Sequence, residues 1–176
     1  PYECGAVLCR HAAAQQAVVQ GVRTGADLDA DEVRVARGEF EPERAAAGLE
    51  LGQLALEKNL LLHVDGCMGG FLLPYLRRAG APVPRFEFDV PGVTSMSMDF
   101  HKYAFAAKGA SVILHRSKEL RRYQIYACSN WTGYTVINPT VQSTKSGGPL
   151  AAAWAALHFI GDAGYLEVAR TVLDMT

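Results

Sequence analysis

Two stretches in the middle of the chain have patterns of apolar and polar positions that predict strands, and each leads to a carboxylate. Residues 60–64 form a largely apolar run that ends on Asp65, and small residues follow. A run of this length, bounded by a charge and glycines, is typical of a buried strand of a parallel sheet. Residues 93–98 alternate with a period of two and lead to Asp99. We therefore expect both acids at the carboxyl ends of strands, where open α/β sheets bind their ligands.

Further elements are predicted on both sides of these strands. Helices are expected where strong helix formers dominate, namely at 11–20, 43–58, 72–79 and 149–158. The last of them is nearly all apolar and is expected to be buried, with Trp154 in the core. Prolines at positions 82, 84 and 91 exclude regular structure from the connection before the second strand. A further apolar strand is predicted at 111–115, so the chain is of the α/β class.

The second strand delivers a His-Lys pair, His101 and Lys102, directly after Asp99. A lysine amine forms a Schiff base with a carbonyl, and a carboxylate keeps a pyridinium nitrogen protonated. These are the two protein groups that pyridoxal 5′-phosphate (PLP) needs to act as an electron sink. On residue types alone, the commoner case is that Asp65 caps a helix and Lys102 is solvated.

The residues around these groups favour the chemical interpretation. HVDGCMGGF at 63–71 resembles the HVDAxxGGF motif of the PLP-dependent group II decarboxylase family, and SMSMDFHKY at 95–103 resembles its SxSxDxHKY motif. The similarity is dense over 60–165. Within the family it is closest to the carbon–carbon lyases that act on phosphorylated sphingoid bases. Three more features support that branch: Lys108-Gly109, the NWTG stretch at 130–133, and the Gly147-Gly148 pair that leads into AWA at 153–155.

The resemblance implies a role for each candidate residue. Lys102 would bind PLP covalently, Asp65 would pair with the ring nitrogen, and His101 would lie near the cofactor phosphate. Ser97 shares a strand face with Ser95 and could reach that phosphate, although buried strand serines more often bond to backbone. The implied reaction is a retro-aldol cleavage of the phosphorylated base to a fatty aldehyde and phosphoethanolamine.

Other roles are implied farther from the two motifs. His11 would stack on the cofactor ring; a surface histidine on a helix is the equal alternative. Lys108 and Lys145 would bind the substrate phosphate, although an arginine is usual at the second place and a lysine lacks its bidentate fork. The loop with Thr132 and Gly133 would reach the cofactor of a neighbouring subunit in a homodimer.

The implied fold is the large domain of the fold-type-I PLP enzymes, a three-layer structure with a mostly parallel sheet. Residues 1–176 would make up a partial PLP-binding domain. The N-terminal segment that cups the cofactor phosphate and the C-terminal small domain are both expected to be missing, so the domain would be cut short at both ends.

Composition and charge limit the kinds of binding partner that we expect. The chain has 176 residues, of which 49% are hydrophobic and 20% charged, and its net charge is −1. These values are typical of a globular domain and give no electrostatic reason to bind nucleic acid or membrane lipid. The four cysteines lack metal-site spacing, so we expect reduced, buried thiols, no metal and a cytoplasmic location. An endoplasmic-reticulum anchor upstream in a longer parent protein stays open.

Two alternatives to the lyase remain. One is a PLP-dependent amino-acid decarboxylase on the same scaffold, which would release carbon dioxide instead of an aldehyde. The other is an inactive fragment of either enzyme, which would fail to turn yellow with PLP.

Overall fold

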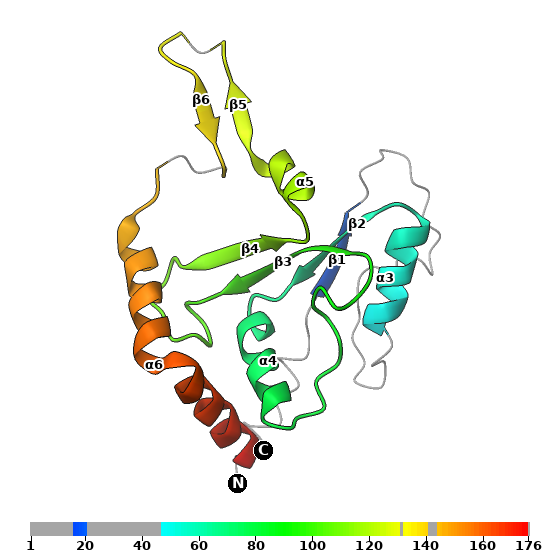
Figure 1. The fold of residues 1–176 in the computed structure, drawn as a ribbon, viewed down its shortest axis with the longest axis vertical. Coiled ribbons are helices and arrows are strands. Elements are labelled where there is room, and N and C mark those ends of the chain that lie inside the picture. The colour runs from blue at the N-terminus through cyan, green and yellow to red at the C-terminus, as the bar shows by residue number, and fades with distance from the viewer. Residues whose placement is uncertain (1–15, 21–46, 131, 141–143, 176) are drawn as a thin grey trace.

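A mixed four-stranded sheet forms the centre of the chain (Figure 1). The computed structural model describes residues 16–20, 47–130, 132–140 and 144–175. The sheet order is β1–β2–β3–β4, with bounds Gln16–Gln20, Leu61–Asp65, Val93–Asp99 and Ser111–His115. The three strands predicted from sequence are confirmed within a residue or two. Both acids end their strands, as expected.

The strand directions differ from the predicted mostly parallel sheet. β2 and β3 are parallel, with His63 opposite Ser95 and Asp65 opposite Ser97. The β1–β2 and β3–β4 pairs are antiparallel, so the described strands form a mixed sheet. The reason lies in the connections. A parallel return needs a crossover of a dozen or more residues, and residues 100–110 between β3 and β4 are too few for one.

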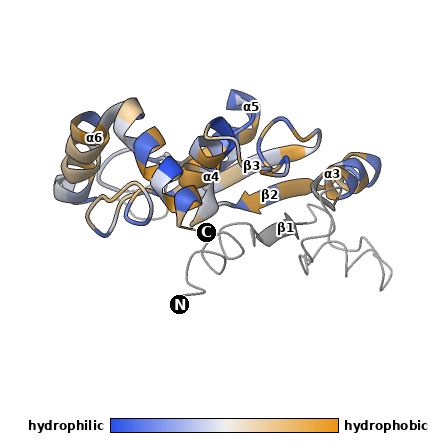
Figure 2. Ribbon diagram, turned by 90° about the horizontal axis from the view of Figure 1, so that it is seen from below, coloured by the Kyte–Doolittle hydropathy of each residue, from blue (hydrophilic) through white to orange (hydrophobic). Residues whose placement is uncertain are grey.

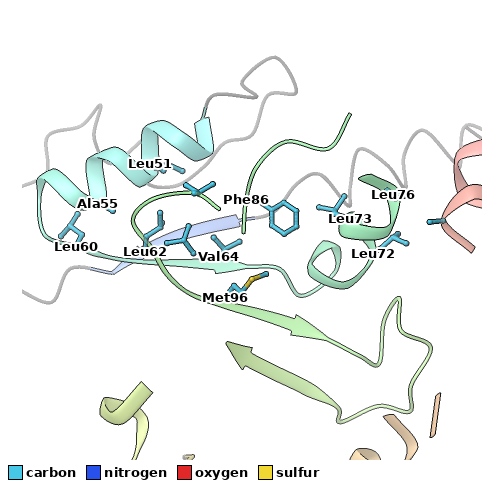
Figure 3. Packing of buried hydrophobic residues seen from close by; sticks show 13 residues of the cluster. Leu51, Ala55, Leu60, Leu62, Val64, Leu72, Leu73, Leu76, Phe86 and Met96 are labelled. Atoms are coloured by element: carbon cyan, nitrogen blue, oxygen red, sulfur yellow. The ribbon is translucent and has the colours of Figure 1, made fainter. Parts of the chain in front are cut away.

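Two helices pack on one face of the sheet, α3 (Ala47–Glu57) and α4 (Gly69–Arg78) (Figure 2). The long α6 (Gly147–Asp174) packs against α4. Leu62 and Val64 of β2 and Met96 of β3 point into the core that these helices share (Figure 3). The remaining core side chains are leucines and other apolar residues: Leu51, Ala55, Leu60, Leu72, Leu73, Leu76, Phe86, Val90, Val93 and Ala169. The described helices thus supply one helical layer, and the second outer layer of the predicted three is not seen in these ranges.

The N-terminal prediction was wrong where the structure tests it. Residues 16–20 of the predicted helix at 11–20 form β1, which pairs with all five residues of β2. The two β-branched valines at the centre of this segment suit a strand, and pairing with β2 overrides the helical preference of Ala and Gln. Residues 11–15 lie outside the described ranges.

The other end of the chain is more exposed than the sequence suggests. After β4, the short α5 (Lys118–Arg121) and the 3-10 turn η1 (Arg122–Gln124) lead into the hairpin of β5 (Tyr126–Cys128) and β6 (Val136–Asn138). Figure 1 shows this hairpin projecting from the body. The predicted burial of 149–158 was wrong: Leu150 is 72% exposed and Trp154 64%, because α6 packs against α4 along one side only.

No helix within the described ranges is both long enough and apolar enough to cross a bilayer.

Candidate functional site

The carboxylate that ends β2 is held from two sides. Asp65 Oδ1 accepts the backbone N–H of Cys67 at 3.0 Å and the hydroxyl of Ser97 at 3.1 Å. Ser97 lies directly opposite Asp65 on the parallel strand β3, so the register of the sheet creates this contact. Both donors use Oδ1. Among the described residues, no hydrogen bond to Oδ2 is present, and that oxygen remains as an acceptor for another donor.

The acid that ends β3 binds the predicted cofactor lysine. Lys102 Nζ lies 2.9 Å from Asp99 Oδ2, and the hydroxyl of Ser111 donates to Asp99 Oδ1 at 2.5 Å. His101 Nε2 is 3.6 Å from the same Oδ2, while its Nδ1 is 3.0 Å from the carbonyl oxygen of Ala110. Because that carbonyl only accepts, Nδ1 carries a proton. Lys102 is thus part of a small network at the strand end.

The two strand ends are neighbours, joined by the backbone of Cys67. Its N–H donates to Asp65, and its carbonyl accepts the N–H of Asp99 at 3.2 Å. The Cys67 side chain also lies close enough to Lys102 to raise the pKa of that amine. One residue of the β2–α4 turn therefore connects Asp65 with Asp99, the partner of Lys102.

The charges of Asp99 and Lys102 stabilise one another. Burial acts to raise the pKa of Asp99, but hydrogen bonds from Ser111 and Lys102 outweigh it, and the net shift of that pKa is downward. The pKa of Lys102 is raised, first by its hydrogen bond with Asp99 and then by that with Cys67. Without other ligands, the pair is therefore a carboxylate and an ammonium at neutral pH.

A further pair on the same sheet face was missed from the sequence. His63 Nδ1 lies 2.9 Å from the Ser95 hydroxyl. This pair lies two residues along the parallel strands from the Asp65–Ser97 pair. Burial lowers the pKa of His63, and the charge of Asp65 opposes that shift. The signal was present in the motif, since positions 63 and 65 point to the same face of a strand. Ser95 and Ser97 therefore bond to side chains on β2.

The other candidates lie elsewhere on the surface. Lys108 is exposed in the turn before β4. Thr132 and Gly133 are exposed between β5 and β6. Lys145 precedes α6 and donates to the Thr140 hydroxyl. His11 lies outside the described residues. The structure thus brings together Asp65, Ser97, His101 and Lys102, and the substrate-phosphate and loop candidates are not part of that cluster.

The arrangement fits an aldehyde-bearing, positively charged ring. It offers a primary amine and, on the adjacent strand, an immobilised carboxylate with one open oxygen. Within the part of the chain that the structure describes, no group of three or more His, Cys, Asp or Glu side chains is placed to hold a metal ion.

Comparisons with known proteins show what the chain is similar to. No protein-family model matches the chain. It is 44% identical over 127 residues to a sphingosine-1-phosphate lyase of Oryza sativa subsp. japonica, a match that covers 72% of this chain and 24% of that protein. A lyase of the same name from Arabidopsis thaliana is 44% identical over 125 residues, covering 71% of this chain and 23% of that protein.

A solved structure shows the same fold. The sphingosine-1-phosphate lyase of Burkholderia pseudomallei superposes with a TM-score of 0.68 and 40% sequence identity, over 74% of this chain and 29% of that one. The chain therefore has the α/β fold of the large domain of the fold-type-I PLP enzymes. More narrowly, it is homologous to the sphingosine-1-phosphate lyases. It spans about a quarter of the length of the curated relatives it matches.

Proposed function

We propose that this chain carries the cofactor-binding centre of a PLP-dependent carbon–carbon lyase that cleaves a phosphorylated sphingoid base. The observation that carries the proposal is that Cys67 links the two strand ends: its N–H donates to Asp65, its carbonyl accepts the N–H of Asp99, and the Asp99 carboxylate binds Lys102. The similarity to sphingosine-1-phosphate lyases over about 70% of the chain supports the substrate class.

The residues present fit PLP. Lys102 would hold the cofactor covalently through Nζ, and the open Oδ2 of Asp65 would accept the N–H of the protonated ring. His101 is the candidate for the cofactor phosphate, since it lies beside Lys102 and has one ring nitrogen not bonded to Ala110. Bound PLP supplies an electron sink for the bond that breaks next to the substrate nitrogen.

The chain's own groups then have defined tasks. Asp65 keeps a proton on the ring nitrogen, because an immobilised carboxylate stabilises the positive form. Ser97 and the Cys67 N–H fix the direction of Asp65 and leave only one oxygen for the ring. Lys102, when not bonded to the cofactor, carries a proton at Nζ and can return it to a product.

Substrate recognition would involve exposed groups. Lys108 and Lys145 are proposed to bind the substrate phosphate, as cations on surface turns can do. Thr132 and Gly133 are proposed to reach the cofactor of a second subunit, and their exposed position on a projecting hairpin supports that geometry. The same reasoning favours a homodimer. The cytoplasmic location stays a prediction, to be checked by cell fractionation.

The test supplies PLP and a phosphorylated sphingoid base to the purified chain and measures release of fatty aldehyde. A parallel reaction with glutamate or an aromatic amino acid measures carbon dioxide, the product of a decarboxylase. We expect aldehyde from the sphingoid phosphate, and its loss in Lys102→Ala. Lys118→Ala, which removes an exposed lysine on α5, is the matched control and should keep the activity. Carbon dioxide without aldehyde would support the decarboxylase, and neither product would support an inactive fragment.

A further inference from the structure

Asp99 is held in place by contacts that do not involve Lys102. Its Oδ1 accepts the Ser111 hydroxyl at 2.5 Å, and its backbone N–H donates to the Cys67 carbonyl at 3.2 Å. Ser111 lies directly opposite Asp99 in the antiparallel β3–β4 pair, so the contact follows from the sheet register. The direction of the carboxylate is therefore fixed before a cation binds to it, and Oδ2 is presented to the Lys102 ammonium at 2.9 Å.

The same arrangement occurs twice at this edge of the sheet. At each strand end, a serine on the next strand donates to Oδ1 of the acid: Ser97 to Asp65 and Ser111 to Asp99. Oδ2 is the remaining oxygen in both cases. Under the proposed function, the Asp65 oxygen serves the cofactor ring, whereas the Asp99 oxygen already binds an internal cation. The two acids are thus built alike and serve different partners.

A lysine that carries a cofactor through its aldehyde carbon is released once in each turnover. The substrate nitrogen bonds to that carbon, the bond to the lysine nitrogen breaks, and the lysine leaves as an amine that takes up a proton. A released ammonium must then be held where it does not compete with the substrate. Asp99 is within hydrogen-bond distance of Lys102 and only 16% exposed, so it meets that need.

We propose that Asp99 is a positioning residue for Lys102: it binds the ammonium whenever this lysine is not covalently bonded, and Ser111 keeps Asp99 oriented for that contact. This inference rests on the proposed function. This contact also affects the reactivity of Lys102. A pair that holds the ammonium firmly lowers the concentration of neutral amine, and only the neutral amine attacks an aldehyde.

The other groups that face the pair are few. His101 Nε2 approaches Asp99 Oδ2 at 3.6 Å from the turn after β3, and the Cys67 side chain faces Lys102 from the turn after β2. Asp65 lies two residues before Cys67. Of these groups, Asp99 carries the opposite charge and lies 2.9 Å from the ammonium. Removing its charge should therefore change the titration of Lys102 more than any other single substitution.

The first test uses the cofactor-free chain. Its lysines are dimethylated with carbon-13, each signal is titrated by NMR, and Lys102 is assigned by its absence in Lys102→Arg. We expect Asp99→Asn to lower the pKa of Lys102 by about one unit, which is roughly tenfold more neutral amine at a given pH. Ser111→Ala should lower the pKa of Lys102 by less. Because this variant retains both charges, it serves as the second test if Asp99→Asn does not fold. Asp89→Asn, which removes a partner of Arg85, is the control and should leave Lys102 unchanged.

The second test adds PLP and follows the yellow colour with time near neutral pH. The yellow absorbance should develop several-fold faster in Asp99→Asn than in the parent chain and reach the same final value per chain. An unchanged pKa of Lys102 in both Asp99→Asn and Ser111→Ala overturns the inference, as does an unchanged colouring rate in Asp99→Asn. If the parent chain never colours, the proposed function fails, and the NMR titration still decides the role of Asp99.

Discussion

The region that holds the site differs in kind from the region that follows it in sequence. The inner region, made of α3, β2, α4 and β3, shares one buried core, and its strand ends supply Asp65 and Lys102 with fixed partners. The outer region, made of the β5–β6 hairpin and the first half of α6, exposes large apolar side chains, among them Ile137 at 70% and Phe159 at 92%. The proposed cofactor site thus depends on contacts within one chain, whereas the proposed recognition groups lie on exposed surfaces.

The largest expected effect is the difference in unfolding free energy between a substitution in the inner region and one in the outer region. Leu76 of α4 is 2% exposed in the shared core, so Leu76→Ala should lower the free energy of unfolding by about 3 kcal/mol. Ile137→Ala in the hairpin removes a side chain with little to pack against, and should change it by less than about 0.5 kcal/mol. Urea unfolding measures both. Equal losses would mean that the hairpin belongs to the folding core.

A second substitution tests how closely α3 packs against the connection that leads into β3. Gly92 has a φ of +91°, and a Cβ there would lie 2.2 Å from the carbonyl oxygen of Gly52 in α3. Gly92→Ala should therefore cost about 2 kcal/mol or more, from backbone strain and the clash together. Gly80 has a similar φ of +103° with nothing within 4 Å, so Gly80→Ala should show the strain alone, about 1 kcal/mol. Thermal unfolding of the two variants gives the difference, and equal losses would contradict the close packing.

A third, smaller effect concerns the site itself. Ser97→Ala removes one of the two donors to Asp65 Oδ1 and should cost about 1 kcal/mol of stability. It should also weaken PLP binding several-fold, because the carboxylate is then less fixed. Ser95→Ala, which affects His63 instead, is the matched control and should leave PLP affinity nearly unchanged. Titration of the yellow absorbance measures both variants. Equal affinities of Ser97→Ala and the parent chain would remove Ser97 from the site.

The smallest effect is a pH dependence of the free energy of unfolding, which arises in the inner region. The pKa of His63 in the folded chain lies below its ordinary value of 6.5, mainly through burial. The unfolded chain therefore binds more protons between these two values, so stability rises with pH across that window and falls on acidification below 6.5. Unfolding free energies measured from pH 7 downward should show this slope, and His63→Gln should reduce it. The same slope in His63→Gln would assign it to another group.

Much of the inner region could be predicted from sequence, because apolar runs and alternation report directly on buried strands. Residues 16–20 could not, since their local preference for helix is weaker than pairing with β2. Trp154 was placed in the core on its apolar neighbours alone, yet burial depends on what packs against a helix. The partnership of Asp99 with Ser111 depends on strand register across a turn, which residue types do not reveal.

The central claim is that Asp65 and Lys102 serve one cofactor. Its most direct test is to incubate the folded chain with PLP, reduce it with borohydride, and locate the added pyridoxyl mass by peptide mapping. The account predicts the label on Lys102 and on no other lysine, with lower occupancy in Asp65→Asn at limiting PLP. A label spread over exposed lysines such as Lys108, Lys118 and Lys145, or occupancy that is indifferent to Asp65, would contradict it.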